Sequence, residues 1–338
     1  MKAIAYQHSL PATNPLALQD IELPAPEAKG HDLLVEVRAI AMNPVDTKIR
    51  RGVQPESGAW KVLGWDAAGV VRAVGEQVTG FKPGDRVWYA GALDRPGSNA
   101  ELQLVDARLA GAMPASLDFA AAAALPLTTI TAWELLFDRL RIPHGGGQGQ
   151  SLLVVGGAGG VGSILIQLAR QLTQLTVIAT ASRPETQAWV RELGAHHVLD
   201  HREPLAEALQ RQGLSAPQHV ASLTNTDQHY AQLVELLAPQ GQLALIDDFD
   251  PAAVNVLALK RKSLSLHWEL MFTRSLYQTA DMARQGELLS QAAALVDAGT
   301  LRSTQGEHFG RITAENLRRA HQAQESGSVR GKIVLEGF

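Results

Sequence analysis

The sequence predicts an α/β protein with two domains, one of them built around a doubly wound parallel sheet. The chain has 338 residues, more than one domain usually holds. About the first 115 residues contain short apolar runs separated by Gly, Pro and Asp turns, which is a β-rich pattern. From Leu152 onwards, strand-like and helix-like segments alternate, and this is typical of a parallel sheet with helices on both faces.

The composition is ordinary for a globular enzyme and excludes several classes of partner. Hydrophobic residues make up 46% of the chain and charged residues 19%, and the formal net charge is −4. Without a run of Lys or Arg, nucleic acid is not an expected partner. The most apolar stretch, Phe119–Leu127, is interrupted by Pro126, so no stretch is expected to reach the ~18 apolar residues that cross a bilayer. Met1–Tyr6 reads as a strand and not as a secretion signal, so we expect a cytoplasmic protein.

Four strands and one short helix are predicted in the β-rich part. Pro44 favours the first turn of the helix, where its missing N–H costs nothing. The strands are Lys2–Gln7, Leu33–Ala41, Gly69–Val74 and Arg86–Tyr89, and the helix is Asn43–Arg51.

Helices dominate residues 116–140, and the alternating part follows. Gly194 is expected to stop one of its helices. The predicted strands are Leu152–Val155, Val177–Ala181, His197–Leu199, His219–Leu223 and Gln242–Ile246, and the helices between them are Gly160–Leu172, Pro184–Leu193, Leu205–Arg211 and Asp227–Leu237. The tail is predicted to hold helices at Gln278–Ala298 and Ala314–Glu325 and a last strand at Lys332–Leu335.

A glycine motif at the start of the alternating part indicates a Rossmann dinucleotide-binding domain. Gly157, Gly159 and Gly162 have the G-x-G-x-x-G spacing and lie between a predicted strand and a predicted helix. The first glycine permits a tight turn, the second lets the backbone approach a pyrophosphate, and the third lets the helix pack on its strand. The helix N-terminus offers free N–H groups to the phosphates, so Ala158, Gly160 and Val161 are also candidate cofactor contacts. The alternative is a glycine-rich structural turn.

The end of the next strand favours NADPH over NADH. An acidic residue there would bind the ribose hydroxyls of NAD. This chain instead has Ser182 and Arg183, which can bind a 2′-phosphate through a hydroxyl and a guanidinium. In the alternative interpretation, Ser182 and Glu185 form a helix capping box and Arg183 is a solvated surface charge.

Several segments together resemble one family, the medium-chain dehydrogenase/reductase superfamily, over essentially the whole chain. They are Ala41–Asp46, Gly64–Val71, Gly80–Val87, Leu125–Trp133, the glycine motif and Gly331–Leu335. The resemblance implies a GroES-like β domain at residues 1–120 and 268–338, completed by the C-terminal segment, and a Rossmann NADP-binding domain at residues 121–267. It also implies an active site in the cleft between the two domains and a homodimer paired through sheet edges.

The zinc ligands of the alcohol dehydrogenases in this superfamily are missing. The catalytic Cys would fall near Val45 and the His at Trp65, and the chain has no cysteine at all. Catalytic zinc needs protein ligands, so we expect no metal. The scattered histidines lack ligand spacing and are interpreted as surface or packing residues: His144, His196, His197, His201 and His308. The chain is therefore similar to the zinc-free quinone oxidoreductase branch, and to its subgroup of zinc-type alcohol dehydrogenase-like proteins.

This reading implies an NADPH-dependent, zinc-independent oxidoreductase acting on quinones or α,β-unsaturated carbonyls. Such acceptors are already electrophilic, and hydrogen-bond donors can stabilise the charge that develops on their oxygen. Two alternatives stay open. One is an alcohol or aldehyde dehydrogenase of small substrates, and the other is a non-catalytic NADPH-binding redox sensor.

The remaining site candidates come mostly from the resemblance, and each has a structural alternative. Asn43 is expected near the nicotinamide, or is a turn former before Pro44. Asp46 is a catalytic candidate, or orders that loop or caps the short helix. Trp65 is expected to face the cleft because it replaces a zinc ligand.

Three further residues are expected near the cofactor. Thr128 follows from the resemblance, or is an ordinary helix residue. Lys332 reaches the cofactor from the last strand, or is an exposed strand lysine. Ile246 follows the fifth strand of the parallel sheet, and loops at strand carboxyl ends contact ligands in such folds.

Overall fold

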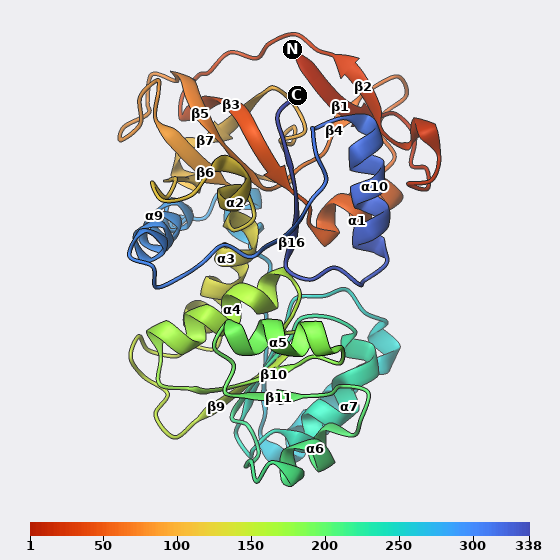
Figure 1. Cartoon of the computed structure of the whole chain (residues 1–338), viewed down its shortest axis with the longest axis vertical. Coiled ribbons are helices and arrows are strands. Elements are labelled where there is room, and N and C mark those ends of the chain that lie inside the picture. Colours follow the sequence, from red (N-terminus) through yellow and green to blue (C-terminus); the bar gives the residue numbers. More distant parts are fainter. The chain divides into compact units, whose positions relative to one another are not determined.

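The computed structural model describes residues 1–338, which divide into two compact units (Figure 1). Unit 1 consists of Met1–Ile130 and Phe272–Phe338, and unit 2 is the continuous segment Thr131–Met271. The chain thus passes between the units at residues 130 and 272, where the sequence places the boundaries at 120 and 268.

Unit 1 is the β-rich unit and contains a three-stranded sheet and a seven-stranded sheet. The smaller sheet has the order β2-β1-β4, and the larger one runs β15-β16-β3-β5-β6-β8, with β7 also paired to β3. The strands are β1 (Lys2–Tyr6), β2 (Gln19–Glu22), β3 (Asp32–Ala41), β4 (Lys61–Val62), β5 (Ala67–Val74), β6 (Arg86–Tyr89), β7 (Leu102–Asp106), β8 (Ala110–Ala112), β15 (Gln305–His308) and β16 (Lys332–Glu336).

The last strand of the chain lies inside the larger sheet of unit 1, between β15 and β3. Strand β16 pairs antiparallel with β3, with Val334 opposite Ala41, and the Met42 N–H donates to the Ile333 carbonyl at 2.9 Å. This register places the start of β16 next to the end of β3, so residues near position 332 lie beside residues near position 43. The helices of unit 1 are α1 (Pro44–Gly52), α2 (Phe119–Ala123), α3 (Pro126–Trp133, which runs on into unit 2), α8 (Thr273–Leu276), α9 (Arg284–Asp297) and α10 (Ala314–Glu325).

Unit 2 is a six-stranded parallel sheet in the order β11-β10-β9-β12-β13-β14, a doubly wound fold. The order reverses at β9, so α4 and α5 cover one face and α6 and α7 the other (Figure 1). The strands are β9 (Ser151–Val155), β10 (Thr176–Thr180), β11 (His197–Leu199), β12 (His219–Ser222), β13 (Gln242–Leu245) and β14 (Ser265–Trp268), and the helices are α4 (Gly160–Leu172), α5 (Pro184–Glu192), α6 (Leu205–Arg211) and α7 (Thr226–Leu236). The predicted α/β class with a Rossmann sheet is confirmed.

The sequence missed several short strands and misplaced one helix start. Strands β2, β4, β7, β8, β14 and β15 were not predicted; each has two to five residues, too few for a clear alternation. The helix expected from Gln278 begins only at Arg284, because Gln278 adopts a left-handed backbone conformation with φ of 45°.

One helical stretch meets a criterion for a membrane span that no part of the sequence was expected to reach. Residues Phe119–Arg139 form a 21-residue run that is apolar enough by length and composition to cross a membrane, although 89% of its most apolar window is buried inside the protein. The expected interruption at Pro126 is confirmed, since α2 ends at Ala123 and Pro126 occupies the first turn of the next helix, α3. A buried core helix meets the same criterion, so the stretch is explained by packing.

Candidate functional site

The glycine loop, residues 156–162 of unit 2, joins β9 to α4. Gly156 has φ of 80°, a left-handed conformation in which glycine is favoured. Its N–H donates to Thr180 Oγ1 at 3.0 Å, and the Gly157 N–H donates to the Thr180 carbonyl at 3.2 Å. The loop is therefore pinned to the end of the neighbouring strand β10.

The three motif glycines are required for different reasons. A Cβ on Gly157 would lie 2.9 Å from Ala179 Cβ, and one on Gly162 would lie 2.5 Å from the Gly156 carbonyl oxygen. A Cβ on Gly159 would meet nothing closer than 3.5 Å, an ordinary contact. Gly157 and Gly162 thus serve packing within the protein. Gly159 leaves bare backbone at the N-terminus of α4, which fits a diphosphate.

The loop after β10 differs from the predicted capping arrangement. The N-cap of α5 is Arg183, whose N–H donates to Thr186 Oγ1 at 3.2 Å. A capping box of Ser182 with Glu185 was therefore the wrong alternative, because Pro184 fixes the helix start one residue later. The Arg183 guanidinium pairs with the exposed Glu185 at 3.2 Å and is itself 43% exposed.

A second arginine, missed in the sequence, lies at the same sheet edge. Arg202 follows β11 and donates from Nη2 to the Ser182 carbonyl at 2.9 Å. It also pairs with Asp200 at 2.6 Å, and hydrogen bonds from Arg202 lower the pKa of Asp200. Strand β11 pairs in parallel with β10, with Leu199 opposite Thr180, so the residues after both strands meet. The sequence already predicted both strands in one parallel sheet, and their pairing as neighbours could have located Arg202 beside Ser182.

Ile246 directly follows β13, so it lies at the carboxyl-terminal ends of the parallel strands, and it is half-buried. The next residue, Asp247, accepts hydrogen bonds from the Thr226 N–H at 3.0 Å and from its hydroxyl at 2.5 Å. Asp247 therefore caps α7 and holds the two loops after β12 and β13 together.

In unit 1 four side chains form a buried polar cluster of Asn43, Asp46, Asp66 and Lys332, each at most 3% exposed. Asn43 Nδ2 donates to Asp66 Oδ2 at 2.9 Å, and Lys332 Nζ donates to the same oxygen at 2.8 Å. Lys332 Nζ also donates to Asn43 Oδ1. The cluster joins the start of α1, the residue before β5 and the start of β16.

The two carboxylates of the cluster also hold helix starts. The Asn43 N–H donates to Asp46 Oδ2 at 2.8 Å, so Asp46 caps α1 from its third position, as one sequence alternative proposed. The Leu127 N–H donates to Asp66 Oδ1 at 2.8 Å, so Asp66 accepts from the first turn of α3. Thr128, the next residue, is 2% exposed and its hydroxyl donates to the Leu125 carbonyl at 3.1 Å.

Burial dominates the electrostatics of the cluster. It raises the pKa of Asp46 to about 7; the Asn43 N–H and Lys332 act against this shift, and Asp66 adds to it. Burial also raises the pKa of Asp66 above its usual value, opposed mainly by the adjacent Lys332 ammonium. Lys332 is thus neither exposed nor unpaired, and the alternative of an exposed strand lysine was wrong.

Trp65 is buried in unit 1, with 1% of its surface exposed. Its indole N–H donates to the Ala92 carbonyl at 3.0 Å, and its ring makes an edge contact with Phe272 at 6.5 Å between centroids. The side chain that stands at a zinc-ligand position is therefore fixed by packing.

The donor set of the cluster does not fit a zinc ion. Asp66 is bound by an ammonium and an amide N–H, and the residues at the two ligand positions are Val45 and Trp65. A divalent cation would have to displace the Lys332 charge, which it repels. Groups of three or more His, Asp or Glu side chains that could hold a metal ion do not occur in the structure.

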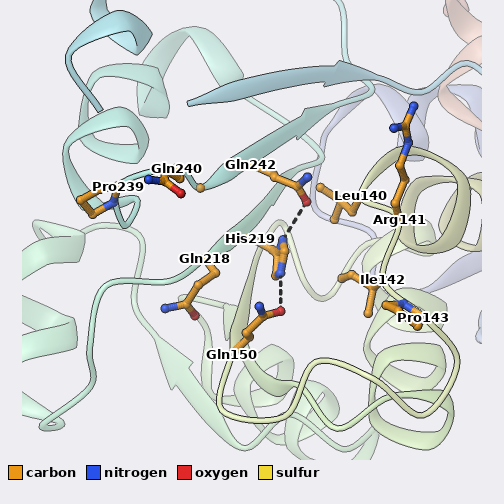
Figure 2. A pocket seen from close by; sticks show the side chains of 11 residues that line it. Leu140, Arg141, Ile142, Pro143, Gln150, Gln218, His219, Pro239, Gln240 and Gln242 are labelled. Carbon is orange, nitrogen blue, oxygen red and sulfur yellow. Dashed lines mark hydrogen bonds between the residues drawn. The ribbon is translucent and has the colours of Figure 1, made fainter. Parts of the chain in front are cut away.

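A cavity of about 480 Å³ lies elsewhere in unit 2, at the amino-terminal ends of β9, β12 and β13 (Figure 2). His219 lies at its centre, with its ring nitrogens 3.1 Å from Gln242 Oε1 and 3.0 Å from Gln150 Oε1. Gln218 Oε1 accepts from the Ser151 N–H at 2.9 Å. The polar groups of the cavity are hydrogen-bonded within the protein, and they lie at the amino-terminal ends of the strands, whereas the glycine loop lies at the carboxyl-terminal end of β9. We therefore interpret the cavity as a structural feature of the sheet.

Comparison with known proteins decides the family. The chain is 38% identical over 337 residues, 99% of both chains, to a zinc-type alcohol dehydrogenase-like protein of Staphylococcus aureus. This chain belongs to the medium-chain dehydrogenase/reductase superfamily. The model of the alcohol dehydrogenase GroES-like domain matches residues 29–115, and that of the zinc-binding dehydrogenase family matches residues 193–335. The protein is accordingly an NAD(P)-dependent oxidoreductase.

Other members of the superfamily resemble the chain over most of its length. A crystal structure of a putative zinc-dependent alcohol dehydrogenase protein from Rhizobium etli is 55% identical, with a TM-score of 0.95, and the match covers 100% of this chain and 98% of that one. The quinone oxidoreductase of Lama guanicoe is 29% identical over 94% of this chain and 91% of its own length. A mycobacterial protein complexed with NADPH is 28% identical with a TM-score of 0.82, over 99% and 100% of the two chains.

Proposed function

We propose that this protein is an NADPH-dependent, zinc-independent reductase of quinones or α,β-unsaturated carbonyl compounds. The observation that carries the proposal is the buried polar cluster, in which the Lys332 ammonium donates hydrogen bonds to Asp66 and Asn43. Val45 and Trp65, which the resemblance aligns with zinc ligands, are the sequence neighbours of Asp46 and Asp66. Donors fixed in a dry site stabilise negative charge on an acceptor oxygen, which is the need of a quinone or an enone. Oxidising a simple alcohol without a metal would lack a means of activating the hydroxyl.

The choice of NADPH rests on the edge of unit 2 after β10 and β11. Arg202 donates to the Ser182 carbonyl there, and Arg183 is the next residue. The two nearby carboxylates are each paired with an arginine, Asp200 with Arg202 and Glu185 with Arg183. Two guanidinium groups favour a ligand with an extra phosphate. The NADPH complex of the mycobacterial relative supports the same choice.

The bound coenzyme would supply the hydride. Backbone N–H groups of the glycine loop would bind its diphosphate, with Gly159 giving the closest approach. We propose that Lys332 binds and polarises the acceptor oxygen and that Asn43, whose amide N–H groups are used by Asp66 and the Ala41 carbonyl, holds Lys332 in place beside the nicotinamide. We also propose that Thr128 and Ile246 contact the nicotinamide end. Trp65 and Asp46 would act by holding this arrangement in place.

A panel of acceptors tests the proposal. NADPH absorbance should fall with quinones and enones, and the rate should not change on addition of a chelator or of zinc. Purified protein should contain no stoichiometric zinc by elemental analysis. If the protein instead oxidises alcohols only when zinc is present, it is an alcohol dehydrogenase, which is the activity named for the Rhizobium etli relative. Tight NADPH binding with no oxidation by any acceptor would support a redox sensor.

We further propose a homodimer formed through β14. This strand is at the edge of the parallel sheet of unit 2, and its residue Trp268 is 53% exposed and stacks on Phe249 at 5.4 Å between ring centroids. An uncovered edge strand with an apolar end favours pairing with a second copy. Light scattering should give the mass of a dimer, and Trp268→Lys should shift it to that of a monomer; a monomeric wild-type protein contradicts the proposal.

A further inference from the structure

Lys332 has a donor to spare. An ammonium group has three N–H bonds, and the structure uses two of them, toward Asn43 Oδ1 and Asp66 Oδ2. The side chain is 3% exposed and its two acceptors fix its direction. A buried, oriented ammonium with one N–H left over can donate a hydrogen bond, and a proton, to one further atom.

The charges of the polar cluster require one more proton. Asp46 and Asp66 carry two negative charges when both are ionised, and Lys332 carries one positive charge. Buried charges are costly unless they are balanced, so the neutral state of the cluster holds a proton on a carboxyl group. Asp46 is the carboxyl that can hold it, since it receives only backbone N–H groups, whereas Asp66 receives three donors, one of them the Lys332 ammonium.

We propose that Lys332 is the acid of the reduction and that Asp46 is a positioning residue that keeps the Lys332 proton transferable. The inference rests on the proposed function. As hydride reaches the acceptor, an oxygen gains negative charge; the Nζ–H bond of Lys332 breaks and an O–H bond forms on that oxygen. The lysine is left neutral and regains a proton from water, so hydride and proton together account for the reduced product.

The charge of Asp46 changes the electrostatic surroundings of the Lys332 ammonium. With Asp46 protonated, the ammonium faces one carboxylate, Asp66; with Asp46 ionised, it faces two. The charged groups that face Asp46 are Lys332 and Asp66, and its other neighbours, Asn43 and Gly64, contribute backbone N–H groups. The raised pKa of Asp46, about 7, places this change near neutral pH, so proton transfer should weaken as the pH rises through 7.

The first test needs no turnover. Carbon-13 NMR of the aspartate carboxyl groups in the coenzyme-free protein should show one resonance that titrates near pH 7 and disappears in Asp46→Asn. A carboxyl group of Asp46 that titrates at the ordinary aspartate value would overturn the proposal, because the cluster would then hold no spare proton.

The second test separates acid catalysis from coenzyme binding. Lys332→Arg keeps the charge but replaces the ammonium with a guanidinium that does not give up its proton. We expect kcat to fall about 100-fold and its solvent isotope effect to change, while the Kd for NADPH and the melting temperature stay close to wild type. Lys82→Arg, on the exposed surface of unit 1, is the matched control. Unchanged kcat and isotope effect in Lys332→Arg would refute the acid role.

Asp46→Asn provides an independent check should the lysine variant fold poorly. Its carboxamide keeps the size and cannot ionise, so the decline of kcat above pH 7 should be lost or moved to higher pH. A profile identical to wild type contradicts the role of Asp46. A wild-type protein that reduces no quinone or enone overturns the proposed function, and this proposal with it, whereas an active wild type with active Lys332→Arg overturns only the acid.

Discussion

The glycine loop of unit 2 and the polar cluster of unit 1 are built in opposite ways. The loop is seven consecutive residues whose backbone, we propose, binds the coenzyme, and a Cβ on its Gly159 would meet nothing closer than 3.5 Å. The cluster is four side chains from three separate segments of the chain, each buried and each dependent on the others. A side chain at Gly159 should therefore reduce coenzyme binding without loss of stability, whereas removal of the carboxylate at the centre of the cluster should reduce stability.

The comparison is tested most strongly at Asp66. Asp66→Ala removes the carboxylate that accepts from Lys332, Asn43 and Leu127, and leaves a buried ammonium without its counter-charge. We expect a loss of about 3–5 kcal/mol in the free energy of unfolding. Urea denaturation measures it, with the exposed Glu56→Ala as control. A loss below about 1 kcal/mol would mean that the cluster is not a coupled unit.

The next largest effect is expected in the loop. Gly159→Val should weaken dinucleotide binding at least 100-fold, measured by fluorescence titration, because its side chain would occupy the approach to the diphosphate, while the melting temperature stays near wild type. Gly162→Val is the contrasting variant, since its Cβ would collide with the Gly156 carbonyl oxygen, and it should lower the melting temperature. Equal destabilisation by both variants would remove the distinction between a binding and a packing glycine.

A smaller effect concerns pH and stability. The folded-state pKa of Asp46, about 7, lies above the ordinary value near 3.9, so the folded state binds an extra proton between these pH values. Its contribution to stability is full below about pH 4 and falls as the pH rises to 7. Relative to wild type, Asp46→Asn should gain roughly 2 kcal/mol between pH 5 and pH 7 in denaturant titrations. A stability difference independent of pH would contradict the raised pKa.

The smallest expected effect concerns the preference of unit 2 for NADPH over NADH. Arg183→Ala and Arg202→Ala should each weaken NADPH about tenfold, or roughly 1.4 kcal/mol, and leave NADH nearly unaffected, because only NADPH carries the 2′-phosphate. Competition binding measures both, with the exposed Arg191→Ala on α5 as control. Equal losses for the two coenzymes would show that these arginines do not read the phosphate.

The part of the structure that could be predicted from the sequence differs between unit 2 and unit 1. The strand, glycines and helix around Gly159 were predicted nearly to the residue, because a turn and its flanking periodicities are local. Arg202 was missed, since its place beside Ser182 depends on the parallel pairing of β10 with β11. The capping of α5 was also misread, because Ser182 and Arg183 are adjacent and only the backbone conformation distinguishes them.

By itself the sequence determined the α/β class, the nucleotide motif and the absence of cysteine, since each follows from residue types or short spacing. Only the tertiary structure decided that Lys332 is buried on Asp66 and Asn43, 266 and 289 residues away in the chain. The pairing of β16 with β3 creates that contact, and strand pairing between distant segments is set by the packing of whole faces, which no local pattern contains.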